Sequence, residues 1–464
     1  MDRIINFFEQ LKGKKIAFFG IGVSHTKLIT LLAKKGLDIT ACDERTKEQM
    51  EGTYAQLNAL GVKLCLGETY LHSLDYDIIF RTPGMLPSKK ELQLAKQKGI
   101  VVTSELEVFI ALCPCKTIGI TGSDGKTTTT TLIYECLKKQ GYTTHLGGNI
   151  GTPLLPIIEQ IKPEDIVVIE LSSFQLISMN NALDSAVITN ITPNHLDMHT
   201  NMQEYIQAKH NVFLHQNAFS TTVLNEDNEE TRILMERVRG KYYGFSRKNP
   251  VTRGCYVTKD DSVVFIENGI LTPIMACKDI VLAGVHNIEN YLAAICAVWN
   301  LVQPSVIKEV AQTFMGVAHR MEFVKQTQDG ITWYNDSIAT SPTRTIAGLR
   351  TFSKKIIMIA GGYDKNLDYT PLAPILIEKT KALILMGTTA QKIENAIKLN
   401  IGYEQDSPII YHVRTMEEAV DLSHKIGGKG DILALSPASA SFDSYSNFEQ
   451  RGNHFKQLVS RDRG

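Results

Sequence analysis

The chain lacks cysteines in arrangements that bind metal or form a disulfide framework. Its eight cysteines are scattered, no C-x-x-C pair occurs, and the closest two, Cys113 and Cys115, flank a proline. Zinc sites and disulfide-stapled folds need recurring short cysteine spacings. We therefore expect reduced and mostly buried thiols, with neither disulfide bonds nor zinc.

The chain also lacks an excess of charge of either sign. Its 49 Lys and Arg residues equal its 49 Asp and Glu residues in number. Proteins that bind nucleic acids or anionic membranes usually carry a basic surplus. We therefore expect small-molecule substrates and no nucleic acid.

Long hydrophobic runs are missing as well. No apolar run approaches the ~18 residues that a membrane-spanning helix needs. The first residues, M-D-R-I-I-N-F-F-E-Q, include acidic side chains and no cleavage-type segment. We expect a cytoplasmic protein, acting as a monomer, without membrane insertion.

The length and the alternation of strand and helix patterns indicate several α/β domains. At 464 residues the chain is too long for one core, and ~150 residues per domain suggests three. Alternating strands and helices are typical of parallel α/β sheets. We predict domains over residues 1–107, 108–318 and 319–464.

Apolar runs and turn residues predict the individual elements. The first part should contain strands at 15–19, 38–42, 77–80 and 100–103 and a helix at 27–35. The second should contain strands at 166–169 and 186–190, a hairpin over 253–271 with an Asn268-Gly269 turn, and a helix at 288–299. The third should contain strands at 355–360, 382–386 and 431–436 and a helix at 416–425. Polar residues follow these strands, where open parallel sheets bind ligands.

Residues 119–128, G-I-T-G-S-D-G-K-T-T, predict a phosphate-binding loop. Closely spaced glycines let backbone N–H groups converge on an anion, and the N-terminus of the following helix adds partial positive charge. Lys126 would reach the outer phosphates, and Thr127 would offer its hydroxyl to Mg²⁺. The pattern is incomplete, because Ile120 stands where a strict phosphate loop has its first glycine. The alternative is a glycine-rich turn that only caps a helix.

Three polar residues follow this loop along the chain. Glu170 ends an apolar strand and could hold Mg²⁺, directly or through water; the alternative is an acid that faces solvent. His195, close to Asp197 in the loop after the next strand, could ligate a metal or accept a proton. Lys209 lies on the next helix, and its composition alone indicates an ordinary surface charge.

Further candidates lie towards the C-terminus. Asn287 precedes an apolar helix, so it is either an N-cap or a contact for adenine. Arg320 could neutralise charge on a transferring phosphoryl group or form a surface ion pair. Asp336 ends a predicted strand. The stretch S-P-A-S-A-S-F-D-S-Y-S-N-F-E-Q-R-G is rich in hydroxyl residues and could bind a small carboxylate, or simply turn into a helix.

The segment G-I-G-V-S-H near the N-terminus resembles part of a dinucleotide-binding fingerprint, with Asp43 placed to contact a ribose. His25 stands at the position of the third glycine. A uridine diphosphate group needs the same close backbone approach. The segment is therefore weak support for a nicotinamide cofactor.

The chain resembles the Mur ligases in an ordered set of motifs that spans nearly its whole length: TGSDGKTT, GGNIG, ELSSFQL, NITPNHLD, QAKH, GVHNIEN, HRME, NDSIAT and SPASASFDSYSNFEQRG. The resemblance implies an N-terminal Rossmann-like domain for a UDP-sugar, a central P-loop-type ATPase domain with a mainly parallel sheet, and a C-terminal Rossmann-like domain for an amino acid. Its pattern is most similar to members that add D-glutamate to UDP-N-acetylmuramoyl-L-alanine in peptidoglycan precursor synthesis. ATP with Mg²⁺ would convert the alanyl carboxylate to an acyl phosphate, which the amine of glutamate attacks.

The resemblance also implies roles for individual residues. The catalytic set would be Lys126, Glu170, His195, Lys209 and Arg320. Lys209 matches a lysine that is carbamylated in this family, and the metal ligands would be Thr127, Glu170, His195 and Lys209. ATP would contact Gly122, Ser123, Asp124, Gly125, Lys126, Thr127, Thr128, Asn287, Arg320 and Asp336. The UDP-sugar would contact Val23, Ser24, Asp43, Glu44, Arg45, Gly84 and Asn149. Glutamate would contact Thr340, Lys365, Ser441, Phe442 and Phe448.

Three positions depart from the family pattern. Ile338 replaces a lysine of the usual D-S-K-A-T-N motif, which puts the amino-acid specificity in question. Asn194 replaces an acid before His195, and His25 replaces the glycine noted above. The alternatives are a related ligase that adds L-glutamate or another amino acid, a folylpolyglutamate synthetase, a nicotinamide oxidoreductase, and a non-catalytic nucleotide-binding regulator.

Overall fold

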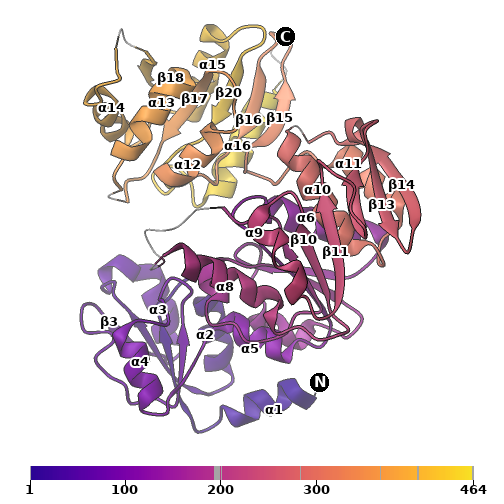
Figure 1. Cartoon of the computed structure of the whole chain (residues 1–464). Helices are drawn as coiled ribbons and strands as arrows, with labels where there is room; N and C mark the ends of the chain where they lie inside the picture. The colour runs from indigo at the N-terminus through magenta and orange to yellow at the C-terminus, as the bar shows by residue number, and fades with distance from the viewer. Residues whose placement is uncertain are drawn as a thin grey trace. The chain divides into compact units, whose positions relative to one another are not determined.

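The computed structural model describes residues 2–192, 199, 201–282, 284–365, 367–404 and 407–461. The chain forms two compact units, Met1–Phe314 and Met315–Gly464, whose elements Figure 1 labels. The first unit contains a five-stranded and a nine-stranded sheet, and the second contains a six-stranded sheet. The predicted α/β class is confirmed. The predicted domain boundaries, after residues 107 and 318, stay a prediction.

The first sheet is fully parallel, with the strand order β3-β2-β1-β4-β5. Its strands are β1 (Lys15–Phe19), β2 (Asp38–Asp43), β3 (Lys63–Leu66), β4 (Ile78–Arg81) and β5 (Val101–Thr103). Its helices are α1 (Asp2–Gln10), α2 (Val23–Lys34), α3 (Glu51–Ala59), α4 (Lys90–Gln97) and α5 (Glu105–Leu112). The strand order reverses direction between β1 and β4, and such a switch point opens a crevice at the carboxyl ends of the strands.

The helix expected at 27–35 begins earlier, at Val23. Gly22 is its N-cap residue in an extended conformation, so the helix follows the turn after β1 at once. The N-terminus of α2 therefore lies beside the carboxyl end of β1, which is the position that favours an anionic ligand.

The second sheet is parallel from β7 to β12, in the order β14-β13-β12-β11-β10-β9-β6-β8-β7. Its strands are β6 (Lys116–Thr121), β7 (Thr144–Gly148), β8 (Ile166–Glu170), β9 (Ser185–Ile188), β10 (Thr221–Asn225), β11 (Lys241–Ser246), β12 (Gly254–Val257), β13 (Ser262–Glu267) and β14 (Ile270–Ala276). The helices of this part are α6 (Lys126–Gln140), α7 (Ser173–Leu176), α8 (Met202–Leu214), α9 (Glu229–Arg232), α10 (Val285–Val298) and α11 (Pro304–Thr313).

Two hydrophobic clusters cover the two faces of this sheet. One cluster joins α6, α10 and α11 to the strands, through residues such as Leu132, Leu292 and Val310. The other joins α8 to the opposite face and continues into the first sheet, through residues such as Phe213 and Phe18. This shared core explains why the first two sheets belong to one unit.

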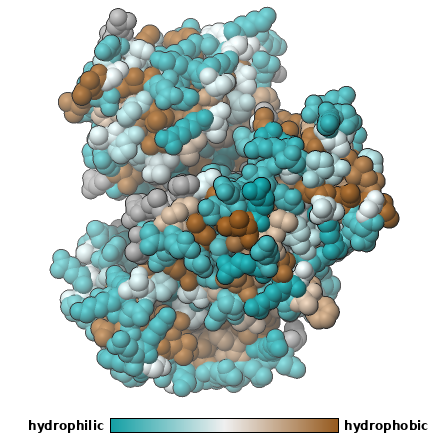
Figure 2. Space-filling view, in the orientation of Figure 1, coloured by the Kyte–Doolittle hydropathy of each residue, from teal (hydrophilic) through white to brown (hydrophobic). Residues whose placement is uncertain are grey.

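The expected hairpin over 253–271 is present and is part of a larger antiparallel end of the sheet. Strands β12, β13 and β14 pair in antiparallel order, and Asn268 and Gly269 form the β13–β14 turn, both with positive φ. β14 is the outermost strand; Pro273 lies within it and pairs with Val264, and the register shifts between Val263 and Val264 of β13. Hydrophobic side chains gather over these strands in Figure 2, and Ile270 is 70% exposed.

The third sheet has the order β15-β16-β20-β17-β18-β19, and only the β15–β16 pair is antiparallel. Its strands are β15 (Glu322–Gln326), β16 (Thr332–Asn335), β17 (Ile356–Gly361), β18 (Thr380–Met386), β19 (Ile409–His412) and β20 (Ile432–Leu435). Its helices are α12 (Pro342–Leu349), α13 (Ala373–Lys379), α14 (Ala390–Lys398), α15 (Met416–Ile426) and α16 (Phe448–Ser460). Helices α12 to α14 pack on one face, and α15 and α16 pack on the other.

Within the described ranges, no helix combines the length and the apolar character that crossing a membrane requires.

Alanine substitutions at Gly269 and Gly52 test whether the first residue lies in a left-handed turn and the second in a helix. A Cβ at either position meets no atom within 4 Å, but Gly269 has φ +77° and Gly52 lies in α3. Gly269→Ala should lower the free energy of unfolding by ~1 kcal/mol, because a left-handed conformation strains an L-residue. Gly52→Ala should raise it by up to ~1 kcal/mol, because alanine favours helix. Urea unfolding of the two variants measures these changes, and shifts of equal sign would contradict the assigned turn.

Candidate functional site

The predicted phosphate loop connects β6 to α6 and is tightly packed at its two glycines. A Cβ on Gly122 would lie 1.9 Å from Thr189 Oγ1, and a Cβ on Gly125 would lie 2.2 Å from Asn290 Oδ1. Gly125 has φ +78° and is the N-cap residue of α6. Only glycine fits at these two places, so the backbone itself forms the surface of the loop.

The loop after β9 holds the phosphate loop in place. Asn190 accepts hydrogen bonds from the backbone N–H of Ser123 (2.9 Å, at its carbonyl oxygen) and of Asp124 (2.9 Å, at Oδ1). Thr189 Oγ1 donates to the carbonyl oxygen of Asp124 at 2.5 Å. β6 and β9 are neighbours in the sheet, so this contact lies at the carboxyl ends of adjacent parallel strands.

Two ammonium groups lie at the loop. Lys126 Nζ donates to the carbonyl oxygens of Gly122 (2.9 Å) and Ser123 (2.8 Å). Lys209 Nζ donates to the carbonyl oxygen of Gly122 at 2.7 Å. Lys209 is 1% exposed, so its interpretation as a surface charge is wrong. Burial, together with the nearby charge of Lys126, lowers the pKa of Lys209 well below its usual value.

Glu170 is buried at the end of β8, so the alternative of a solvent-facing acid is also wrong. Its Oε1 accepts a hydrogen bond from Asn149 Nδ2 at 2.7 Å. Its Oε2 is buried and has no hydrogen-bond partner among the described residues. A buried carboxylate oxygen in this state is costly unless a ligand or a cation satisfies it.

His195 lies outside the described residues, as do Asn194 and Asp197. Among the residues that are described, no group of three or more His, Cys, Asp and Glu side chains forms a metal-binding cluster. Thr127 is buried in the first turn of α6.

Asn287 is not the N-cap of α10, which is Gly284; it lies within the first turn and is buried. Asn290 Nδ2 donates to Asn287 Oδ1 at 3.0 Å, and Asn290 Oδ1 accepts from Thr129 Oγ1 of α6 at 3.2 Å. The start of α10 is therefore joined by hydrogen bonds to the helix that follows the phosphate loop.

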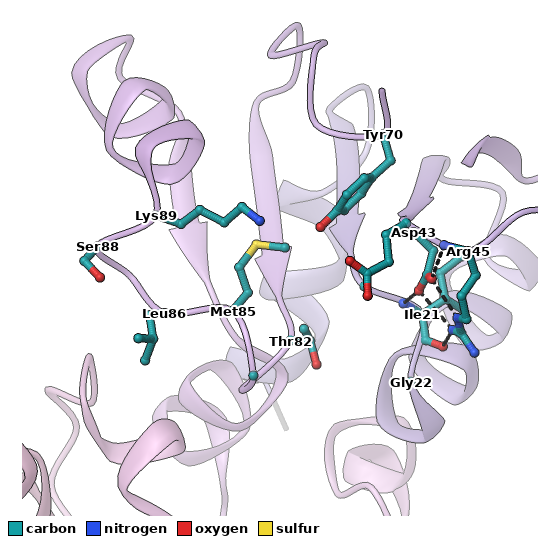
Figure 3. Close-up of a pocket in the computed structure, with 13 residues that line it drawn as sticks. Ile21, Gly22, Asp43, Arg45, Tyr70, Thr82, Met85, Leu86, Ser88 and Lys89 are labelled. Carbon is teal, nitrogen blue, oxygen red and sulfur yellow. Dashed lines mark hydrogen bonds and ion pairs between the residues drawn. The ribbon is translucent and has the colours of Figure 1, made fainter. Parts of the chain in front are cut away.

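A cavity of about 690 Å³ opens at the switch point of the first sheet (Figure 3). The predicted residues Asp43, Glu44, Arg45 and Gly84 all line it. Asp43 accepts from the backbone N–H of Ile21 at 2.6 Å and from Arg45 Nε at 2.7 Å. Burial raises the pKa of Asp43, but the bonds from Arg45 and Ile21 outweigh it and lower the pKa overall.

A second cavity, of about 280 Å³, adjoins the first and shares Gly22 and Thr82 with it. Ser24 and Asn149 line it, as predicted. Val23, the first residue of α2, follows Gly22 directly. Because Asn149 is bonded to Glu170, this cavity ends at the sheet that carries the phosphate loop.

Sequence reasoning missed several residues that line these cavities. Arg81 is 1% exposed; it donates to the carbonyl oxygen of Met85 at 3.2 Å and to Ser178 Oγ. His25, identified only as a departure, is buried, and burial lowers its pKa to about 4. Tyr70 and Lys89 line the larger cavity. Arg81 could have been identified from the sequence, because a charged residue at the end of an apolar strand often marks a ligand site.

In the second unit, Asp336 follows β16 and is 3% exposed. It accepts from Ser436 Oγ at 2.7 Å and from the backbone N–H of Met321 at 3.2 Å. Burial raises its pKa to about 7. Arg320, next to Met321, is exposed and contributes positive charge near this carboxyl group.

The predicted amino-acid site follows the ends of three neighbouring strands of the third sheet. Ser441 is buried, whereas Phe442 is 58% exposed and lies 5.3 Å from Lys365 Nζ. Thr340 and Phe448 are partly buried.

Arg451, in the E-Q-R-G end of the predicted motif, was also missed. It is 3% exposed and donates to the carbonyl oxygens of Ser337 (2.9 Å), Ser439 (3.1 Å) and Ala440 (3.0 Å). It forms no salt bridge among the described residues. Its guanidinium group therefore fastens the loop after β16 to the loop after β20.

The raised pKa of Asp336 predicts a pH dependence of stability. The folded state holds this proton up to about pH 7, whereas an unfolded aspartate releases it near the usual pKa of 3.8. The free energy of unfolding should therefore fall as the pH rises from about 4 to about 7. Asp336→Asn, which stays neutral, should lack this component. Urea unfolding of both proteins at several pH values tests it; a stability difference that does not change with pH would contradict the raised pKa.

Comparison with protein families gives two matches. Residues 120–298 match the Mur ligase middle domain, and residues 319–439 match the Mur ligase glutamate ligase domain. The chain is 49% identical over 462 residues to the UDP-N-acetylmuramoylalanine–D-glutamate ligase of Acetivibrio thermocellus, covering 99% of this chain and 98% of that protein. It is 47% identical over 456 residues to the protein of the same name from Clostridium botulinum, covering 98% of each.

Solved structures agree on the fold. The UDP-N-acetylmuramate–alanine ligase of Thermotoga maritima superposes with a TM-score of 0.54 at 18% identity, covering 96% of this chain and 99% of that one. The chain therefore belongs to the Mur ligase family, has its three-domain α/β architecture, and is an ATP-dependent ligase that forms carbon–nitrogen bonds.

Proposed function

We propose that the chain joins D-glutamate to UDP-N-acetylmuramoyl-L-alanine during the cytoplasmic synthesis of peptidoglycan precursors. The observation that carries this proposal is the 49% identity, over 99% of the chain, to a ligase of that name. The expected domains, residues 1–107 for the UDP-sugar, 108–318 for ATP and 319–464 for the amino acid, follow from the same relationship. We further propose that the enzyme acts as a monomer.

ATP would bind at the phosphate loop through Gly122, Ser123, Asp124, Gly125, Lys126, Thr127 and Thr128. The close packing of Gly122 and Gly125 supports this role, since it leaves space only for backbone at the loop surface. Lys126 would exchange its bonds to loop carbonyl oxygens for bonds to phosphate oxygens. Asn287 would contact the adenine side, Asp336 the ribose, and Arg320 the phosphates.

The proposed reaction needs two substrates in contact at the carboxyl edge of the second sheet. An oxygen of the alanyl carboxylate attacks the γ-phosphorus of ATP, ADP leaves, and an acyl phosphate forms. The neutral amine of glutamate then attacks the carbonyl carbon, and phosphate leaves as the amine loses a proton. Lys126 and Arg320 would balance the negative charge on the phosphoryl group, and positioning would supply much of the acceleration.

The residues at the loop fit Mg²⁺, which prefers oxygen ligands. Glu170 offers a buried carboxylate oxygen without a hydrogen-bond partner among the described residues, and Thr127 offers a hydroxyl in the first turn of α6. His195 would complete the site, as the family motif implies. When bound, the ion would draw negative charge from the phosphate oxygens.

Lys209 would serve this site as a carbamate. Carbamylation joins a neutral amine to CO₂ and releases a proton, so it needs an amine whose pKa is low. The lowered pKa of Lys209 supports this chemistry. The product would place a negative charge in the buried pocket that holds the Lys209 amino group.

The UDP-sugar would bind in the two cavities of the first unit, contacting Val23, Ser24, Asp43, Glu44, Arg45, Gly84 and Asn149. Glutamate would bind in the second unit, contacting Thr340, Lys365, Ser441, Phe442 and Phe448. The second candidate is a ligase for L-glutamate or another amino acid, because Ile338 lacks the charge that the family has there.

Phosphate release gives the direct test of function. Release from ATP should require both UDP-N-acetylmuramoyl-L-alanine and D-glutamate, because the acyl phosphate forms on one substrate and is consumed by the other. A colorimetric phosphate assay across D-glutamate, L-glutamate and other amino acids measures this. Release that does not depend on the UDP-sugar would exclude the proposed reaction, and turnover only with another amino acid would establish the second candidate.

Lys209→Ala should lower turnover by about 10–100-fold, because it removes a proposed metal ligand. Acetate or formate should restore part of the activity, since a small carboxylate can occupy the space of the carbamate. Lys126→Ala serves as the matched control. Its turnover should also fall, because a phosphate contact is lost, but a small carboxylate should not restore it. Normal turnover by Lys209→Ala, or equal rescue of both variants, would contradict the carbamate.

A further inference from the structure

The larger cavity of the first unit is lined in part by Tyr70 and Lys89, two residues to which no role has been given. Its volume of about 690 Å³ is in the range of small-molecule sites. Asp43, Glu44 and Arg45 form one side of it, after β2. Tyr70 follows β3, the neighbour of β2, and lies on the same side. The other side consists of Gly84, Met85, Leu86, Ser88 and Lys89, which follow β4. In Figure 3 the side chain of Tyr70 lies beside Asp43, and the side chain of Lys89 extends towards it from the other side of the cavity.

The stability of the fold does not account for Lys89. It is the N-cap residue of α4, and its side chain makes no capping hydrogen bond. N-caps are normally Ser, Thr, Asp or Asn, and a positive charge at this end opposes the helix dipole. Lys89 has no salt bridge among the described residues, and Nζ lies 5.8 Å from the centroid of the Tyr70 ring. An ammonium group therefore borders the cavity without a carboxylate partner.

The two side chains differ in what they can recognise. An aromatic ring beside a cavity can stack on a planar base, and an ammonium group can pair with phosphate oxygens. A base and its phosphates are separated by one ribose, which suits a ring and a cation that are neighbours. The carboxylates of Asp43 and Glu44 can accept hydrogen bonds from ribose hydroxyls or from a base N–H.

We propose that Tyr70 and Lys89 bind the nucleoside diphosphate part of the substrate, with the uracil stacked on Tyr70 and the diphosphate paired with Lys89. The identity of this ligand rests on the proposed function. The inference adds Tyr70, after β3, and Lys89, before α4, to the binding residues that follow β2. The diphosphate would then lie between the turn after β1 on one side and the ammonium group of Lys89 on the other.

The test is a calorimetric titration of the intact protein with UDP at two salt concentrations. Lys89→Met removes the charge but keeps an unbranched side chain, and it should weaken UDP binding about tenfold and reduce the dependence of affinity on salt. Tyr70→Leu should weaken binding by a similar factor, because stacking is lost, and leave the salt dependence unchanged. The control is Lys90→Met, at the neighbouring exposed lysine, which should bind UDP like the wild type.

The outcomes separate this inference from the proposed function. Wild-type affinity in Lys89→Met or in Tyr70→Leu would overturn the role of that residue. An equal loss in Lys90→Met would show a general effect of charge and would overturn the specific pairing. If the wild type itself does not bind UDP, the UDP-sugar assignment fails together with this inference, whereas unaltered variants of a UDP-binding protein refute the inference alone. Thermal melting of each variant, which should match the wild type, verifies that the variants are folded.

Discussion

The hydrogen bond between Asn149 and Glu170 joins the two places in the first unit that the proposed reaction must bring together. Asn149 follows β7, Glu170 ends β8, and the two strands are parallel neighbours. The side-chain bond of 2.7 Å and the bond from the backbone N–H of Asn149 to the carbonyl oxygen of Glu170 fix their separation. One residue thus lines a cavity of the first sheet while its partner lies on the sheet with the phosphate loop. A ligase that activates a carboxylate with ATP needs this adjacency, because the acyl phosphate must form where both substrates meet.

Several charged groups at these sites are buried without an opposite charge in salt-bridge contact among the described residues. Lys209 donates to carbonyl oxygen, Arg451 donates to three carbonyl oxygens and a hydroxyl, and one oxygen of Glu170 accepts no hydrogen bond from the described residues. Burying an ionised group is unfavourable unless hydrogen bonds or an opposite charge compensate. Peptide carbonyl groups compensate the cations here, and each such contact also fixes a loop. The cost in stability therefore coincides with rigid loops at the proposed binding residues of each unit.

The phosphate loop could be predicted because its residues are contiguous in the sequence, and because the local backbone conformation of the loop requires its glycines. Most of the strands could be predicted for a similar reason, since apolar runs bounded by glycine and polar residues mark them, whereas β3, β7, β10, β11 and β19 were not predicted. The burial of Lys209 could not, because it depends on α8 packing against the end of β6, far away in the sequence. Tyr70, Arg81 and Lys89 were missed because they follow different segments and meet only at the switch point of the first sheet. Asn287 was misjudged as a possible cap because the helix begins three residues earlier than the apolar pattern suggested, at Val285.

The outermost strand of the second sheet raises a different matter, the behaviour of the protein at high concentration. β14 presents Ile270 and Leu271 to solvent, and an exposed apolar strand at a sheet margin is a template on which another chain can add a strand. Pro273 lacks the N–H that such an added strand would need, and the irregular register beside it bends the strand. The proline therefore acts against aggregation through this margin, so that the apolar surface of β14 can stay exposed without recruiting further copies into a growing sheet.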